Sequence, residues 1–193
     1  YFSVQAFVDT ADEYDGDEYD FILRECATGE IIDDVRTFRS EAGVLYTDDF
    51  NRRVLAKAFA DANVAYFPLF DARPHVFVGE GTTTSFYYAE EPLAYLPHKR
   101  NVRISDRGTL TNLLTHHSGY TISTGVLSSE MLSGIASIPL DIDQTMQVGY
   151  IMHNERRPSQ LLRSYIANLR KVVEQSPMVS ATLDPFEQPA EAN

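Results

Sequence analysis

The sequence predicts an α/β fold, and two observations carry this prediction. Strand-like segments alternate along the chain with segments in which apolar residues recur every three or four positions, as on one face of a helix. The stretch from Val102 to Val126 shows the pattern most clearly, because strand, helix and strand follow one another directly. Such alternation is typical of an open, largely parallel sheet covered by helices.

Composition limits the possible classes of function. The chain has 193 residues, of which 44% are hydrophobic, enough for one sizeable core or two small lobes. With 28 acidic and 16 basic residues, the net charge of -12 is opposite in sign to a nucleic-acid-binding surface. The single Cys26 excludes an internal disulfide framework and fits a reducing cytoplasm. Because no apolar run is long enough to span a membrane, we expect a cytoplasmic protein without a membrane partner.

The first half of the chain contains three predicted helices and four predicted strands. An acidic loop over 12–20 separates the first helix from the first strand. The predicted helices span 1–14, 30–38 and 51–63, and the predicted strands span 19–25, 42–46, 65–69 and 75–79.

The second half continues the alternation. Its long last helix has Pro158 in the first turn, and residues 176–193 lack periodicity and are predicted to form a disordered tail. A helix capped by Ser105 or Asp106 and ended by Gly119 follows the strand at 102–104. The other predicted elements are helices over 83–91 and 128–132, and strands over 120–123, 134–140 and 146–153.

Catalysis and metal binding find little support in the sequence. The acidic run Asp12–Asp20 resembles a calcium loop, but Ala11 and Ile22 stand where two principal ligands are required, so a solvated turn is the better interpretation. No cysteine pair or histidine spacing fits zinc, and no nucleophile motif is present. We therefore expect no catalytic residue, no metal, no cofactor and no enzymatic activity.

Polar residues gather where strands end and helices begin. Helix starts present unpaired N–H groups, which attract anions and polar ligands. A turn such as Thr124-Gly125 adds a hydroxyl and an accessible backbone. A cap or turn role explains each of these residues equally well. The residues concerned are Thr28, Tyr46, Thr47, Ser105, Asp106, Arg107, Thr109, Thr124 and Gly125.

Four longer segments resemble the effector-binding (regulatory) domain of a LysR-type transcriptional regulator. Together they cover nearly the whole chain except its tail. They are EIIDDVRTFRSEAGVLYTDD, PLFDARPHVFVGE, SFYYAEE followed by ISDRGTLTNLLTHHSGYTISTG, and GIASIPLDIDQTMQVGYIMHNERRPSQLLRSYIANLRK.

The resemblance implies a two-lobed α/β fold of the periplasmic-binding-protein-like type 2. The first lobe would be discontinuous, with residues 1–79 and 146–175, and the second lobe would comprise 80–145. Two segments would cross between the lobes, and a small effector would bind between them.

The resemblance also implies partners. The positions that match the effector contacts of the family are Thr28, Tyr46, Thr47, Ser105, Asp106, Thr109, Thr124 and Gly125, with Arg107 as a counter-charge. Hydroxyls and helix starts favour an anionic or zwitterionic effector. The family forms dimers, and tetramers in the full protein, and contacts DNA only through a winged helix-turn-helix domain that this sequence does not contain.

Two departures from the family pattern and two rival functions remain. The first strand of the family, which supplies a Ser or Thr to the effector, would lie before Tyr1. The short connection from Glu80 to Thr82 indicates either a deletion or missing residues, and we favour missing residues because a shorter crossing could not span the hinge. An extracytoplasmic solute-binding protein of the same fold is the main alternative, and a small α/β enzyme is the other. An upstream winged helix would exclude the first rival, and an upstream signal peptide would support it.

Overall fold

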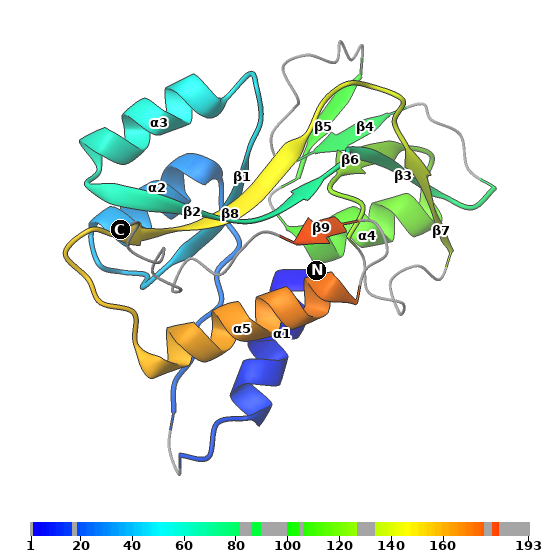
Figure 1. Cartoon of the computed structure of the whole chain (residues 1–193). Coiled ribbons are helices and arrows are strands. Elements are labelled where there is room, and N and C mark those ends of the chain that lie inside the picture. The colour runs from blue at the N-terminus through cyan, green and yellow to red at the C-terminus, as the bar shows by residue number, and fades with distance from the viewer. Residues whose placement is uncertain are drawn as a thin grey trace.

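The computed structural model describes residues 2–16, 19–81, 86–89, 100–104, 106–126, 134–175 and 179–181. Its described strands form two sheets, which two chain crossings connect (Figure 1). The helices are α1 (Phe2–Asp12), α2 (Thr28–Arg36), α3 (Arg52–Asp61), α4 (Arg107–His116) and α5 (Gln160–Glu174). The strands are β1 (Gly43–Thr47), β2 (Val64–Ala72), β3 (His75–Gly79), β4 (Tyr87–Ala89), β5 (Asn101–Arg103), β6 (Tyr120–Ser123), β7 (Ile135–Pro139), β8 (Met146–His153) and β9 (Val179–Ala181).

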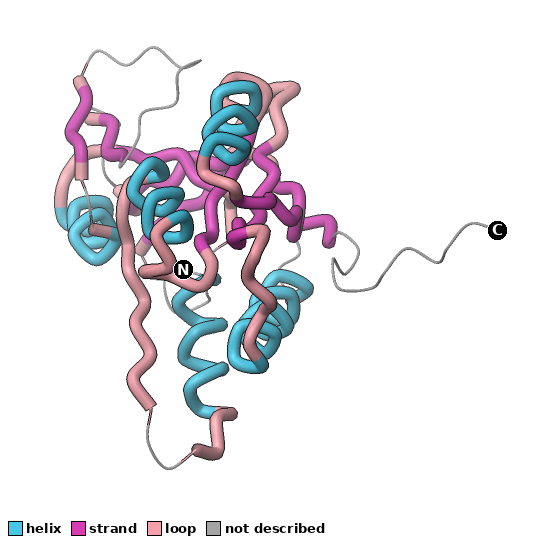
Figure 2. Tube along the Cα trace, turned by 90° about the vertical axis from the view of Figure 1, so that its left-hand side faces the viewer, coloured by secondary structure: helices cyan, strands magenta, loops and turns pink. Residues whose placement is uncertain are grey.

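The first sheet has the strand order β1-β8-β2-β9, and all its ladders are antiparallel. Helices cover both of its faces, as the layer of strands between helices in Figure 2 shows. The amphipathic helix α5 packs with α1 on one face, where Ile166 and Leu169 join Tyr150 in the core. On the other face α2 and α3 bury Val35 and Phe59 against strands β1, β2 and β8. We call this sheet with its four helices the first lobe.

The second sheet has the order β5-β4-β6-β3-β7. Strand β4 is parallel to both β5 and β6, whereas β3 is antiparallel to β6 and β7. Helix α4 packs on this sheet through Leu114, which contacts a core cluster that includes Phe77 and Tyr88. We call this sheet with α4 the second lobe.

The prediction of a largely parallel sheet was wrong. Most ladders are antiparallel because β8 returns to the first sheet late in the chain and inserts between β1 and β2. The first lobe boundary also moves. Since β3 pairs with β6 and β7, the chain leaves the first lobe between Ala72 and His75 rather than at residue 79. Apolar periodicity is local, so it cannot tell which strands are neighbours.

Two segments have a different secondary structure from the one that the sequence predicts. Residues 19–25 were expected to form a strand, but this segment takes part in no ladder of the described chain. Residues 87–89 were expected to be helical and instead form β4, whose Tyr87 and Tyr88 are buried in the second lobe. Residues 83–85 and 90–91 of that predicted helix, the short helix expected over 128–132, and Thr82 of the short connection lie outside the described residues.

The end of the chain also differs from expectation. Pro158 precedes the cap of α5 and does not occupy its first turn, because the Ser159 hydroxyl accepts the N–H of Leu162 at 3.0 Å. In turn, the Glu41 carboxylate accepts the N–H of Ser159 at 2.7 Å. Within the segment expected to be a disordered tail, Val179–Ala181 forms β9 and pairs with β2.

Candidate functional site

The two lobes join where two chain segments cross between the sheets. Strand β2 ends at Ala72 and β3 begins at His75, while β7 ends at Pro139 and β8 begins at Met146. The crossings are linked, because the N–H of Leu140 donates to the carbonyl of Pro74 at 2.9 Å. His75 and Pro139 are also paired in the second sheet. We call this region the junction.

A row of polar residues crosses the first lobe beside the junction. Thr47 of β1 is paired with Gln147 of β8, and Gln147 is paired with Asp71 of β2. The Gln147 amide donates to the Asp71 carboxylate at 3.1 Å, and the Tyr66 hydroxyl donates to the Gln147 carbonyl at 2.8 Å. Directly paired residues share a face of the sheet, so these side chains form one group, the polar row.

The phenol of Tyr66 belongs to the polar row, and its surroundings change its pKa. Burial raises the pKa of its phenol to about 12, and the charge of Asp71 also raises it. A hydrogen bond with the Thr47 side chain and the charge of Arg52 lower the pKa but do not outweigh burial. At neutral pH the phenol is therefore protonated and acts as a fixed donor.

The predicted pair Tyr46 and Thr47 is divided by the strand itself. Successive side chains of a strand point to opposite faces. Thr47 is buried and belongs to the polar row, whereas the Tyr46 side chain packs against the core beneath α1 and α5. Only one of these two neighbours therefore lies with the polar row.

Thr124 and Gly125 lie at the junction on the second lobe. They follow β6, whose last residue Ser123 is paired with His75. Gly125 has φ of +80°, and a Cβ atom there would lie 2.5 Å from Nδ1 of His75, so glycine is required on both counts. The same Nδ1 lies 2.8 Å from the carbonyl oxygen of Arg73, which fits an Nδ1–H donor. Thr124 is buried.

The start of α4 is occupied by its own cap. The Asp106 carboxylate accepts the N–H of Thr109 at 2.6 Å and that of Gly108 at 3.4 Å. Hydrogen bonds with the side chain and backbone of Thr109 hold the pKa of Asp106 below its ordinary value. The expectation of several unpaired N–H groups at this helix start was wrong for these two, because a carboxylate already bonds them.

Topology puts this helix start on the same edge of the sheet as Thr124 and Gly125. Strands β5, β4 and β6 are parallel, so Arg103 and Ser123 end at one edge. Ligands of open α/β sheets bind at the carboxyl ends of parallel strands. Ser105 and the side chain of Arg107 lie outside the described residues.

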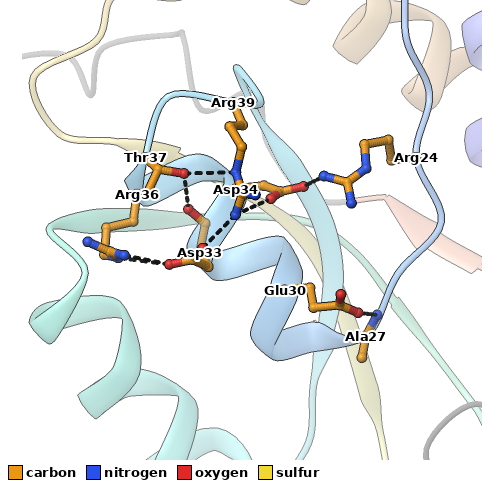
Figure 3. A network of polar contacts seen from close by, with 8 residues as sticks. All are labelled: Arg24, Ala27, Glu30, Asp33, Asp34, Arg36, Thr37 and Arg39. Carbon is orange, nitrogen blue, oxygen red and sulfur yellow. Dashed lines mark hydrogen bonds and ion pairs between the residues drawn. The ribbon is translucent and has the colours of Figure 1, made fainter.

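Thr28 is the first residue of α2 and follows the cap residue Ala27. The Glu30 carboxylate accepts the N–H of Ala27 at 3.2 Å, which fixes the helix start (Figure 3). Helix α2 packs on β1 through Val35, in the same core cluster as Leu45. Thr28 is thus held on the first lobe, but strand register does not align it with the polar row.

An ion network anchors the other end of α2. The buried Asp34 carboxylate pairs with Arg24 of the extended segment before α2 and with Arg39 after it, the latter at 2.9 Å (Figure 3). Arg36 and Arg39 also pair with Asp33, which lowers the pKa of that carboxyl chiefly through the hydrogen bond from Arg36. The network ties the segment 19–26 to the first lobe.

Sequence reasoning missed Tyr66, Asp71, His75 and Gln147 as site candidates. Three of them lie inside predicted strands, and Asp71 lies between the predicted strands 65–69 and 75–79. Only the register across β1, β8 and β2 brings Gln147 beside Asp71 and Thr47. The polar character of Gln147 at the start of an otherwise apolar strand is the one signal that pointed to it.

The described residues contain no group of three or more His, Cys, Asp or Glu side chains arranged to hold a metal ion. Within the same part of the chain, no helix is both long enough and apolar enough to cross a membrane.

Comparison with known proteins gives a likeness of fold. No protein-family model matches the sequence, and no curated protein matches it. Among solved structures, a reduced form of OxyR from N. meningitidis aligns with a TM-score of 0.60 and 12% identity, over 94% of this chain and 92% of that one. The regulatory domain of MetR, a LysR family regulator from N. meningitidis, aligns with a TM-score of 0.59 and 9% identity, over 94% and 92%.

The chain has the fold of a LysR-family regulatory domain. The expected two-lobed, periplasmic-binding-protein-like fold of type 2 is thereby confirmed. Oxidized OxyR from Corynebacterium glutamicum, at a TM-score of 0.58 and 12% identity, is longer, and the chain covers 60% of it. Among these neighbours, MetR is described as a LysR family regulator.

Proposed function

We propose that the chain is the effector-binding domain of a LysR-type transcriptional regulator. A small metabolite would bind between the two lobes and control DNA binding by a winged helix-turn-helix domain outside this sequence. The observation that carries the proposal is the likeness to solved regulatory domains over 94% of the chain. The polar groups that both lobes carry beside the junction support it.

The proposed site takes residues from each lobe. Thr47 contributes from the first lobe, with Tyr66, Asp71 and Gln147 of the polar row around it. Thr109, Thr124 and Gly125 contribute from the edge of the second lobe where α4 begins. Thr28, Ser105, Asp106 and Arg107 complete the set that the family resemblance suggests, whereas the Tyr46 side chain lies on the opposite face of β1.

The chemistry of these residues favours a zwitterionic effector over a simple anion. The carboxylate of Asp106 occupies the start of α4, where an anion would otherwise be attracted. Asp71 adds a second negative charge beside the junction. Hydroxyls of Thr47 and Thr124 supply neutral partners. A metabolite with an ammonium group as well as a carboxylate would satisfy both kinds of neighbour.

The proposed mechanism is a change in lobe closure. Both crossings lie at the junction and are hydrogen-bonded to each other, so an effector that contacts both lobes favours one relative arrangement of them. It can shift that equilibrium only by its difference in affinity for the two arrangements. In the proposed cytoplasmic homodimer, and in a tetramer of the full protein, this change would alter the spacing of the DNA-binding domains.

A thermal-shift screen against amino acids, sulfur metabolites, nucleotides and small organic acids tests the proposal. At a concentration a hundred times its dissociation constant, a bound effector stabilises the folded state by about 2.7 kcal/mol. For a chain of this length the melting temperature then rises by roughly 5 to 10 °C.

Paired variants locate the binding site. Thr109→Val removes a hydroxyl at the start of α4, and Thr115→Val removes one near its end, where the hydroxyl donates to the Thr111 carbonyl at 3.0 Å. We expect the first variant to lose the effector response and the second to keep it. Equal responses from both variants would contradict a site at this helix start. Silence across the whole screen would argue against the effector-binding function.

A further inference from the structure

The first lobe carries an exposed aromatic side chain at the end of its sheet that lies away from the junction. Phe38 follows Thr37, the C-cap residue of α2, and is 52% exposed. Its ring contacts that of His153, with 4.4 Å between the ring centroids. His153 is the last residue of β8, whereas Gln147 of the polar row lies near the start of that strand (Figure 1). Phe38 and the proposed effector site therefore lie at opposite ends of the first sheet.

The backbone of Phe38 is strained. Of the described residues other than glycine, only Phe38 and Asn63 have a positive φ, +60° and +55°. Asparagine adopts this left-handed conformation readily, whereas a bulky side chain clashes with the backbone. Glycine is the usual residue just after the cap of a helix for this reason. Strain of this kind is concentrated at functional sites.

Fixed surroundings hold the ring of Phe38 in place. The N–H of Asn154 donates to the carbonyl of Asn63 at 3.0 Å, and the Asn154 amide donates to the Asn63 side chain at 2.8 Å. The Asn63 amide in turn donates to the Glu155 carboxylate at 3.4 Å. These bonds fix the turn that follows His153, on which the ring of Phe38 rests. A side chain on a fixed support loses little conformational entropy when a partner binds.

Two arginines follow in the same turn. The N–H of Arg156 donates to the carbonyl of His153 at 3.0 Å, so the turn that leads to Arg156 and Arg157 begins at the residue that Phe38 contacts. Within the described part of the chain, neither arginine side chain forms a hydrogen bond or an ion pair. Both guanidinium groups are therefore available to a partner. We call Phe38, Arg156 and Arg157 the Phe38 patch.

We propose that the Phe38 patch binds an acidic segment of a partner protein. An apolar side chain of that segment packs against the Phe38 ring, and its carboxylates pair with Arg156 and Arg157. Aromatic and arginine side chains are enriched at the centres of protein interfaces. Arginine is suited to this role because its guanidinium group can bind a carboxylate through two parallel hydrogen bonds.

Charge favours an acidic peptide over a nucleic acid as the occupant. On a chain with a net charge of -12, two unpaired arginines attract an acidic side chain locally. A nucleic acid presents a continuous row of phosphates and requires an extended basic surface. The acidic groups of this chain would repel such a row beyond the Phe38 patch.

The first lobe also contains a matched surface without the strain. Phe50 is 51% exposed, nearly the same as Phe38, and does not have a positive φ. Arg52 and Arg53 follow it at the start of α3. Variants of these residues control for a general effect of aromatic and basic side chains.

A peptide-display selection on the full chain, without effector, tests the proposal. Short random peptides are selected on the immobilised chain, and the dissociation constants of those enriched are measured by fluorescence anisotropy. We expect the enriched peptides to combine Asp or Glu with an apolar residue. Their affinity should fall about tenfold or more in Phe38→Gly, and equally in the double variant Arg156→Ala/Arg157→Ala. Phe50→Gly and Arg52→Ala/Arg53→Ala should leave it unchanged.

The melting temperature distinguishes a binding role of Phe38 from a structural one. Glycine adopts a positive φ without strain, so Phe38→Gly should melt at the same temperature as the parent chain or higher while it loses the peptide. Phe38→Asn, which also tolerates this φ, repeats the comparison. Lower melting temperatures for both variants would show that the ring serves the fold, and the proposal would be wrong.

Other results would also overturn the proposal. A selection that enriches no peptide, or peptides without an excess of acidic residues, would exclude an acidic partner. Equal affinity of the enriched peptides for all variants would place the contact elsewhere. Binding of DNA that depends on the same three residues would assign the Phe38 patch to a nucleic acid. Because no effector is present, failure here leaves the proposed sensing function untouched.

Discussion

The carboxylate of Asp106 accepts a 2.6 Å hydrogen bond from the backbone N–H of Thr109, three residues further along α4. This is the geometry of a helix N-cap, in which Asp and Asn are about equally effective and Ala is poor. We therefore expect Asp106→Ala to lower the melting temperature, measured by circular dichroism, clearly more than Asp106→Asn. Equal losses in the two variants would mean that the charge, and not the cap, stabilises this helix.

The same carboxyl group contributes a pH dependence of known sign. Hydrogen bonds from Thr109 lower the pKa of Asp106 from its ordinary value of 3.8. A carboxyl group with a lowered pKa stabilises the folded state above its unfolded pKa, and the contribution disappears as the pH falls through the folded value. The stability difference between the parent chain and Asp106→Asn should thus be constant from pH 5 to 7, roughly, and shrink below about pH 4. Urea unfolding across this range measures it, and a constant difference would contradict the assignment.

Tyr66 should show the opposite behaviour at alkaline pH. Burial raises the pKa of its phenol from 10.0 to about 12, so the folded state holds this proton more tightly than the unfolded chain does. The stabilisation that the protonated phenol contributes is fully present below pH 10 and is lost as the pH rises towards 12. Tyr66→Phe should make the alkaline loss less steep. At pH 7 it should cost about 1 kcal/mol, because the Gln147 carbonyl loses its donor.

The control for this prediction is Tyr19→Phe. Tyr19 is 56% exposed in the segment before α2. Its hydroxyl should therefore contribute little to the stability at pH 7, and the alkaline profile should match that of the parent chain. If both variants flatten the profile equally, then burial of Tyr66 is not the cause.

Several elements could be predicted from the sequence because their signals are local. The periodicity of α5 and the turn chemistry after β6 lie within one stretch of chain, and both were found within a few residues. The polar row could not be found this way. Gln147 reaches Asp71 across 76 positions, and Tyr66 reaches Gln147 across 81. Such contacts depend on the insertion of β8 between β1 and β2, which the pattern of apolar residues along the sequence does not reveal.

The buried carboxylate of Asp34 should reveal itself through non-additive mutations. Arg24 and Arg39 both pair with this carboxylate, so the removal of one arginine leaves the buried charge with the other as its partner. We expect Arg24→Ala and Arg39→Ala each to cost about 1 kcal/mol, since both guanidinium groups are about half exposed. The double variant should cost about 3 kcal/mol or more, because the carboxylate is then buried without a partner.

Urea unfolding of the two single variants and the double variant gives the coupling directly. Arg36→Ala is the matched control, because Arg36 pairs with the half-exposed Asp33 and not with Asp34. It should change stability by no measurable amount. A double variant whose loss equals the sum of the single losses would show that water already compensates the Asp34 charge.

Substitutions at Gly125 and Gly134 distinguish the cost of backbone strain from the cost of a steric contact. Both have positive φ, +80° and +81°, but nothing lies within 4 Å of a Cβ atom at Gly134, whereas one at Gly125 would meet the His75 ring. Gly134→Ala should cost about 1–2 kcal/mol of strain alone. Gly125→Ala should cost about 1–3 kcal/mol more, because it also overpacks the junction.

Combining Gly125→Ala with His75→Ala decides whether this contact is the cause. Removal of the ring gives the new methyl group space, so urea unfolding should show the double variant to be less destabilised than the sum of its single losses. The strain from the positive φ should remain, equal to that of Gly134→Ala. If the losses simply add, the ring has already moved aside in Gly125→Ala. The junction would then tolerate a side chain at this position, and the close approach of the turn after β6 to His75 would not depend on glycine.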